Sequence, residues 1–135
     1  MGVGGEAPGE IFWRSLMPRQ EPRETAIVVE KTYDFLLWLL PKAEKLPRSF
    51  RFSVGDRMVA AGLDLLLALV EASFSAEKGA LLDTANRRAN GLRYLLRLSK
   101  DLKLLTLDSY GFAALRLEEI GRMIGGWQKS QRRKE

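Results

Sequence analysis

The sequence predicts an all-α protein, an up-down antiparallel four-helix bundle in a single domain. Four apolar-rich segments follow one another from about residue 24, and none has the strict polar–apolar alternation of a half-buried strand. Leu, Ala, Arg, Lys and Glu, which all favour helices, dominate these segments. The breaks between them are short, so consecutive helices are expected to lie antiparallel. A chain of 135 residues is long enough for one compact domain and too short for two ordinary ones.

Composition divides the chain into three parts. Residues 1–23 hold four of the twelve glycines and three of the five prolines, so we expect a disordered N-terminal tail. Within this tail, the apolar run from Ile11 to Trp13 is a candidate docking motif. Residues 24–131 are the predicted bundle, and residues 132–135 form a basic C-terminal tail.

The first predicted helix runs from about Glu24 to Lys45. Pro41 is expected to kink or end it, because proline lacks the amide hydrogen that a helix interior needs. Pro47 marks the connection that follows. Seven of the eight residues from Tyr33 to Leu40 are apolar, so the middle of this helix is hydrophobic all round.

The second helix is predicted to begin at Ser53 and Asp56. These residues have the spacing of a capping box, with Asp in place of the usual Glu. The helix is expected to reach about Ala72. It is again broadly apolar between Leu63 and Val70, as the first helix is in its middle.

The last two helices each follow a polar residue that suits a helix start. Ser75 or a close neighbour is expected to cap the third helix, which reaches about Leu104. Thr106 opens the fourth, with Asp108 in the first turn, where a carboxylate is favoured. The fourth helix is expected to end between Gln128 and Gln131.

Three small residues of the fourth helix, Ala114, Gly121 and Gly125, fall on one narrow face. Glycine costs a helix about 1 kcal/mol relative to alanine, so its presence there calls for a packing reason. We interpret this face as a tight contact with a neighbouring helix inside a soluble bundle, because the segment is too polar to span a membrane.

The apolar faces of the first two helices are wider than a monomer requires. A bundle helix needs an apolar stripe of roughly 100° turned toward the core, whereas these two are apolar on nearly all sides. A second copy of the same chain is the expected cover for the surplus. The residues expected at this oligomer interface are Tyr33, Phe35, Leu37, Trp38 and Leu66.

The third helix carries the clearest polar constellation. Five polar side chains fall within a sector of about 80°, and four leucines lie on the roughly opposite side, which is the expected core side. Basic groups in such a row lie about 5–6 Å apart, a spacing comparable with that of successive phosphates on a nucleic acid strand. The polar residues are Asn86, Asn90, Arg93, Arg97 and Lys100, and the leucines are Leu92, Leu95, Leu98 and Leu102.

A solvated basic helix face is the alternative to a binding surface. The net charge of +5 is moderate, and Asp64 and Glu71, which share a face of the second helix, could pair with the third. Glu118 and Arg122 have the spacing of an i,i+4 surface pair. The stripe has no aromatic platform, and the chain has no known nucleic-acid-binding motif, so no sequence specificity is predicted.

The absence of His and Cys excludes disulfides, thiolate nucleophiles, Cys/His zinc sites and imidazole acid–base chemistry. The adjacent Glu118 and Glu119 point about 100° apart and cannot form a carboxylate dyad alone. We therefore expect no enzymatic activity, metal, cofactor or small-molecule substrate. The most apolar window, Met58 to Val70, is shorter than the roughly 20 residues of a membrane span, and no secretory signal is visible, so a cytoplasmic protein is expected.

Five stretches of the sequence together carry a family resemblance. They are KTYDFLLWLLP at 31–41, EKLPRS at 44–49, FSVGDR at 52–57, LRYLLRLSKDLKLL at 92–105 and IGRMIGGW at 120–127. In this order they resemble the Avd family, the accessory variability determinant proteins of diversity-generating retroelements. The resemblance covers about residues 27–130 and gives the N-terminal tail no counterpart.

The resemblance implies a pentameric ring of basic four-helix bundles that binds nucleic acid and associates with the reverse transcriptase of the same element. It implies a non-catalytic cofactor that helps the polymerase copy template RNA into mutagenised cDNA during retrohoming. The basic surface would then hold polymerase and template RNA or cDNA together. The residues expected to bind nucleic acid are Arg87, Arg93, Arg97, Lys100 and Lys103, with Arg122 and Lys129 as weaker candidates.

Two other functions remain open at this point. The chain also resembles the four-helix-bundle family encoded in intervening sequences of 23S ribosomal RNA genes, which implies a stand-alone RNA-associated protein. The stretches LLWLLP at 36–41 and RMIGGW at 122–127 favour Avd over that relative. The third possibility is a purely structural oligomeric scaffold that does not bind nucleic acid.

Overall fold

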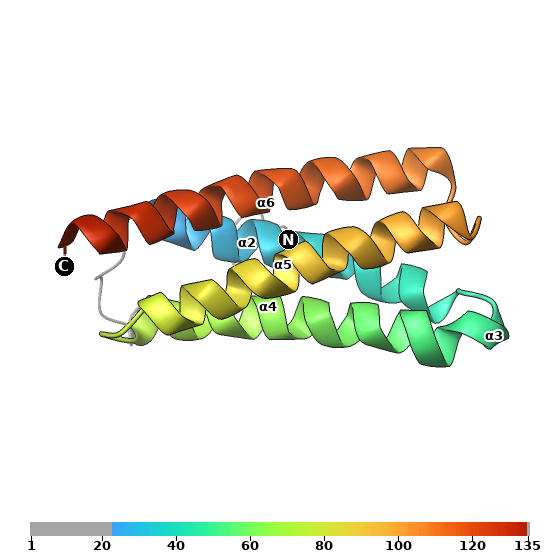
Figure 1. Ribbon diagram of the computed structural model, residues 1–135, viewed down its shortest axis with the longest axis horizontal. Helices are drawn as coiled ribbons and strands as arrows, with labels where there is room; N and C mark the ends of the chain where they lie inside the picture. Colours follow the sequence, from blue (N-terminus) through green and yellow to red (C-terminus); the bar gives the residue numbers. More distant parts are fainter. Residues whose placement is uncertain (1–22, 135) are drawn as a thin grey trace, which may run out of the picture.

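In the computed structural model, which describes residues 23–134, four long helices pack side by side (Figure 1). The described residues contain no strand, so the predicted all-α four-helix bundle is confirmed. The tail predicted for residues 1–23 lies outside the described residues, apart from Arg23. The long helices are α2 (Arg23–Glu44), α4 (Asp56–Phe74), α5 (Gly79–Asp101) and α6 (Leu107–Lys134), and the short pieces α3 (Arg48–Phe50) and η1 (Arg51–Gly55) join α2 to α4.

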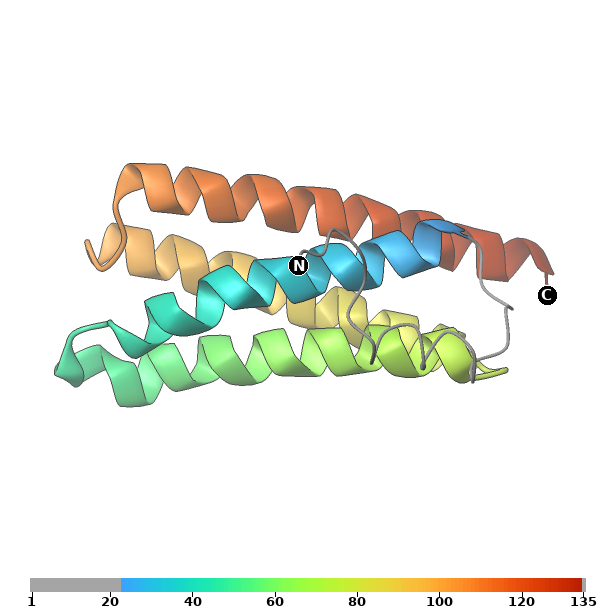
Figure 2. The same cartoon turned by 180° about the vertical axis from the view of Figure 1, so that it is seen from behind.

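The four long helices follow one another up and down around the bundle. Helix α2 packs against α4 and α6, and α5 packs against the same two helices from the diagonally opposite position. Figures 1 and 2 show α3 and the α5–α6 connection at one end of the bundle, while α2 begins and α6 ends at the other.

The core is built from large apolar side chains that recur at helical spacing on every long helix. Burial of each contributes about 1.5–3 kcal/mol relative to exposure. Two buried hydroxyls are satisfied within their own helices, because Thr32 and Ser99 donate to the carbonyls of Val28 and Leu95, both at 2.8 Å. The largest fully buried side chains include Leu39, Met58, Leu65, Leu69, Leu82, Leu92, Leu96, Leu117, Ile120 and Ile124.

The entry into α4 differs from the prediction. Helix α2 ends at Glu44, one turn after Pro41, much as expected. The capping box predicted at Ser53 and Asp56 is wrong, because Ser53 lies inside the π-helical turn η1 and its hydroxyl donates to the carbonyl of Phe50 at 3.3 Å. The chain is already helical when it reaches Asp56, so α4 has no free amino end there to cap.

The start of α5 also differs from the prediction. The helix begins at Gly79, and the position before it, Lys78, makes no side-chain cap. Ser75 instead accepts a hydrogen bond from the amide of Glu77 at 3.0 Å. The Lys78 ammonium donates to the carbonyls of Ala72 and Ser75, at 2.6 and 2.7 Å, so it stabilises the carboxyl end of α4.

Helix α6 begins as predicted and ends later. The hydroxyl of Thr106 accepts a hydrogen bond from the amide of Ser109 at 3.0 Å, and Asp108 lies in the first turn. The helix continues to Lys134 rather than ending by Gln131. The basic residues near the C-terminus that the structure describes are therefore helical.

The core face predicted for α5 is partly wrong. Leu92 is buried, but Leu98 and Leu102 are 45% and 42% exposed. The buried row consists of Leu82, Ala85, Ala89, Leu92, Leu96 and Ser99. The small residues of this row, Ala85, Ala89 and Ser99, allow α4 and α6 to approach α5 closely. The prediction chose the other side of α5 because that side carries the exposed Leu98 and Leu102.

Lys103 follows α5 with a φ of 62°, in the left-handed region that favours glycine. The amides of Lys103 and Leu104 donate to the carbonyls of Lys100 and Ser99, which is the Schellman pattern of helix ends. We expect Lys103→Gly to raise the free energy of unfolding by about 1 kcal/mol, because a Cβ is unfavourable in this conformation. Urea denaturation measures this gain. Lys103→Ala keeps the Cβ and should give none, and equal stability of the two variants would contradict the explanation.

Candidate nucleic-acid interface

Six of the seven predicted nucleic-acid-binding residues lie along α5 and α6, which run antiparallel and side by side (Figure 1). Two contacts set the register of the pair. Gln128 donates to the carboxylate of Asp83 at 2.9 Å near one end, and the Lys100 ammonium lies 4.8 Å from the ring centre of Tyr110 near the other. We call this side the α5–α6 face. Its basic residues are Arg87, Arg93, Arg97 and Lys100 on α5, and Arg122 and Lys129 on α6.

Arg93 reaches across from α5 to α6. Its Nη2 donates to the carbonyl of Leu117 at 3.4 Å, and a Cβ at Gly121 would overlap that nitrogen. Gly121 therefore makes room for an arginine side chain. A Cβ at Gly125 would meet nothing within 4 Å. The close helix contact predicted for the face of Ala114, Gly121 and Gly125 is therefore wrong at the two glycines, and Ala114 borders a groove between α5 and α6 instead.

This groove contains a cavity of about 280 Å³ between α5 and α6. Its lining combines three apolar residues with a cation, a phenol and a carboxylate. Arg93 and Tyr110, whose side chains end in a planar guanidinium and a planar ring, both line it. The lining residues are Arg93, Leu96, Tyr110, Ala114, Leu117 and Glu118.

The predicted cations differ in how far the protein already neutralises them. Arg97 and Lys129 are exposed, and within residues 23–134 neither has a carboxylate at ion-pair distance. The Lys100 ammonium lies 3.4 Å from the carboxylate of the adjacent Asp101. Arg122 lies 3.6 Å from Glu118, which confirms the predicted i,i+4 pair. Arg97 and Lys129 are therefore the most available cations of the α5–α6 face.

Arg87 is less central than predicted. It lies six residues before Arg93, about 120° away around the axis of α5, and so at the outer edge of the face. Its guanidinium donates to the hydroxyl of Thr84 at 3.1 Å. The neighbouring Arg88 turns to the other side and lies 3.5 Å from Asp64, as expected for a pairing of the second and third helices.

A second group of cations lies at the end of the bundle where α3 is found. Figure 1 shows this end also holding the α5–α6 connection, which contains the seventh predicted residue, Lys103. Lys45 and Arg48 are exposed there too. From the sequence, Pro47 indicates only a connection between two helices. Three cations within seven residues, Lys45, Arg48 and Arg51, are the sequence feature that indicates this basic group.

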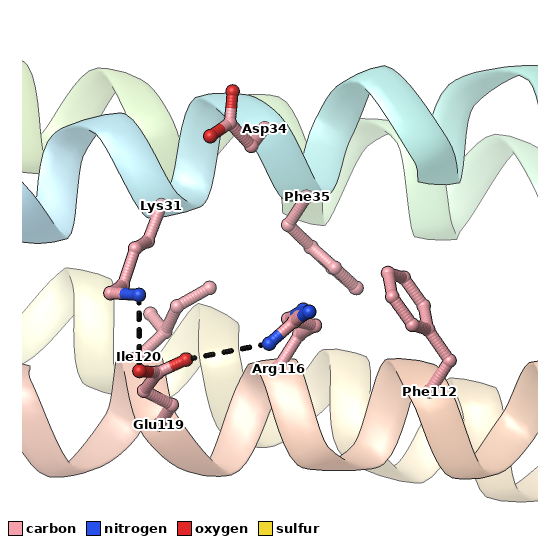
Figure 3. A pocket seen from close by; sticks show the side chains of 7 residues that line it. All are labelled: Lys31, Asp34, Phe35, Phe112, Arg116, Glu119 and Ile120. Carbon is pink, nitrogen blue, oxygen red and sulfur yellow. Dashed lines mark ion pairs between the residues drawn. The ribbon is translucent and has the colours of Figure 1, made fainter.

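A cavity of about 300 Å³ between α2 and α6 is the main alternative site (Figure 3). Glu119 lies between Lys31, at 3.1 Å, and Arg116, at 3.8 Å. The Arg116 guanidinium also lies 5.0 Å from the ring centre of Phe112. Asp34 is the other charged residue of the lining, so the charges cancel. We interpret this cluster as a clamp that holds α2 against α6.

The predicted oligomer interface is partly wrong. Phe35 is 2% exposed and belongs to the core of its own protomer, so it cannot face a second copy. Trp38 is half-buried and packs on Phe112, with ring centres 5.1 Å apart, on the α6 side. Leu66 is partly buried against the core. Tyr33 and Leu37 are 51% and 62% exposed, as an interface would require.

Beside Tyr33 and Leu37, the structure exposes apolar residues that were not among those expected at the interface. The side chain of Leu36 on α2 packs directly over Gly62 on α4, where a Cβ would overlap it. The next residue on each helix lies about 100° further around the helix axis, toward the outside of the bundle. We call these outer residues the α2–α4 patch: Tyr33, Leu37, Leu63, Leu67 and Phe74. A separate α5 row consists of Tyr94, Leu98 and Leu102.

No helix between residues 23 and 134 is long and apolar enough to cross a membrane. No group of three or more carboxylates in this range is placed to hold a metal ion.

Comparisons with known proteins agree with this architecture. The comparison with curated proteins gave no match. Among solved structures, the chain is similar to a protein of unknown function from the S23 ribosomal protein family of Bacteroides thetaiotaomicron VPI-5482. The two are 18% identical with a TM-score of 0.73, over 78% of this chain and 98% of that one, which shows a shared fold. The model of a family described as bAvd-like matches residues 26–131, so the chain belongs to the bAvd-like family.

Proposed function

We propose that this chain is a non-catalytic accessory protein of a diversity-generating retroelement. It binds the reverse transcriptase of the element and its template RNA or cDNA, and it supports mutagenic retrohoming in the cytoplasm. The observation that carries the proposal is the bAvd-like family match over residues 26–131, because that family is of the accessory, non-catalytic type.

The α5–α6 face supports the nucleic-acid part of the proposal. Arg97 and Lys129 are exposed and have no carboxylate partner among residues 23–134, so phosphates are natural partners for them. Each phosphate that a cation neutralises releases condensed counterions, which makes binding strong at low salt. Lys103 and Arg48 extend the cationic surface around the end of the bundle.

The apolar surfaces support a ring, which we propose to be pentameric. A cyclic assembly uses heterologous contacts, in which one surface of a protomer meets a different surface of its neighbour. The bundle offers two such surfaces, the α2–α4 patch and the α5 row. A ring would repeat the basic face in every protomer, and this repetition would raise the avidity for a long polyanion.

Co-purification from the native host tests the proposal. We expect the tagged chain to retain one reverse transcriptase and one abundant template-like RNA through a wash of moderate salt. The control is the same tag on a variant with Arg97→Glu and Lys103→Glu, which should retain less of the RNA.

Two other results would overturn the proposal. Ribosomal RNA without a polymerase would favour a stand-alone RNA-associated bundle, the second candidate, which the fold likeness to an S23-family protein also favours. Recovery of the chain with no specific RNA or polymerase would favour a structural scaffold.

A further inference from the structure

We propose that the groove between α5 and α6 receives a single unpaired nucleobase, while Arg97 and Lys100 bind the flanking phosphates. The inference rests on the proposed function, namely that the chain binds nucleic acid. It adds that the bound strand is single-stranded where it crosses the groove, and that part of the affinity comes from a base.

The size and the lining of the groove suit a flat aromatic ring. The apolar part of the lining of this cavity of about 280 Å³ is Leu96, Ala114 and Leu117. The small side chain of Ala114 leaves this space open, and Gly121 lets the Arg93 guanidinium lie against α6 beside it. Unpaired bases bind to proteins on such apolar surfaces with flat groups beside them.

The walls of the groove offer the contacts that a base uses. Bases stack on aromatic rings and on guanidinium planes, and the lining of the cavity includes one residue of each kind, Tyr110 and Arg93. The Lys100 ammonium lies over one face of the Tyr110 ring, so a base would use the other face. Glu118 can accept a hydrogen bond from a ring N–H or an exocyclic amino group. The hydrogen bond from Arg93 to the Leu117 carbonyl is long, at 3.4 Å, and uses one of five guanidinium donors.

Phosphates can lie beside a base in this position. Lys100 lies 4.8 Å from the Tyr110 ring centre, so its ammonium is beside the groove. Arg97 is one turn back along α5 and fully available. A paired base inside a duplex is stacked between its neighbours and cannot enter a groove between two helices without being unstacked. The groove therefore selects single strands, whereas the surface cations alone would bind either form.

The test compares two oligonucleotides of equal length and charge, one with bases and one with abasic sugars. The oligomeric full-length protein should bind the base-bearing strand about tenfold more tightly, as stacking of a single base predicts. Ala114→Leu, which fills the groove, should remove this difference and leave the affinity for the abasic strand unchanged. Gly126→Leu is the matched control, since it adds the same side chain to α6 where a Cβ meets nothing within 4 Å.

The outcomes separate this inference from the proposed function. Equal binding of the two strands by the wild-type protein would overturn the nucleobase groove and leave nucleic-acid binding intact. Binding of neither strand would overturn the proposed function itself. Circular dichroism shows whether Ala114→Leu remains folded. If Ala114→Leu does not fold, Tyr110→Leu takes its place as the groove variant. The comparison of the two strands with the wild-type protein decides between a nucleobase groove and a purely ionic surface without either variant.

Discussion

Reversing the charge of Arg97 and Lys103 together, by Arg97→Glu and Lys103→Glu, is expected to weaken RNA binding about 100-fold at moderate salt. Each variant residue removes one phosphate contact and places a carboxylate near the same phosphate. Both side chains are exposed, so the helical content and the oligomer mass should not change. Lys103→Glu also keeps a Cβ at the residue with a φ of 62°, so it adds no new backbone strain.

Fluorescence anisotropy over a range of salt concentrations measures this loss. The slope of log affinity against log salt should decrease by about 1.4 for the two lost contacts to a single strand. The control is Arg57→Glu with Arg88→Glu, which changes the net charge equally at two exposed cations that do not belong to the α5–α6 face. An equal loss in the control would mean that only total charge matters, and no loss in the first variant would exclude this surface.

The choice of residues for this experiment depends on the structure. The sequence alone favours Arg93 with Arg97, because both fall in the same polar sector of the third helix. The structure shows that Arg93 fills the space above Gly121 and bonds to the Leu117 carbonyl. A charge reversal there would disturb the groove as well as the surface charge, so its effect on binding would be ambiguous.

The parts of the fold that local chemistry decides could be predicted from the sequence. The number and order of the helices follow from their apolar spacing. The hydroxyl of Thr106 caps α6 because its partner amide, that of Ser109, is only three residues away. The pair of Glu118 and Arg122 depends only on spacing within one helix.

The parts that depend on tertiary contacts could not be predicted. Leucines occupy two sides of α5. The neighbouring helices cover one of these sides, and only the tertiary structure shows which side that is. Gly121 was interpreted as a site of close helix packing, since nothing local shows that Arg93, 28 residues earlier in the chain, will occupy the space beside it. The capping pattern at Ser53 is wrong because α3 and η1 already continue the helix before it.

The candidate surfaces divide in the same way. The basic residues of the α5–α6 face follow from their spacing, whereas their availability depends on partners such as Asp101 beside Lys100. The oligomer interface was expected around a helix that is apolar all round. Only the packing of α2 against α4 and α6 distinguishes the buried Phe35 from the exposed Leu37 two residues later.

Introducing a charge into the α2–α4 patch, by Leu37→Asp with Leu67→Asp, is expected to convert the proposed ring to monomers at micromolar concentration. These leucines are 62% and 60% exposed in the protomer, so the substitutions should leave its core and its helicity intact. In a ring, each aspartate would be buried without a partner, and an unpaired buried charge opposes association strongly. Light scattering after size exclusion measures the mass. The control is Leu115→Asp, at a residue 67% exposed on α6 and outside both apolar surfaces, which should leave the mass of the ring unchanged.

The same variant separates the contribution of the ring from that of the basic face. A monomer keeps every cation of the α5–α6 face, so its binding of a short oligonucleotide should equal that of one protomer in the ring. Its affinity for a long RNA should fall about 100-fold or more, because linked sites raise effective concentration only while they are held together. A monomer that binds long RNA as tightly as the wild-type protein would show that each protomer acts alone. An unchanged mass would exclude the α2–α4 patch as the interface, and the α5 row would then need another partner.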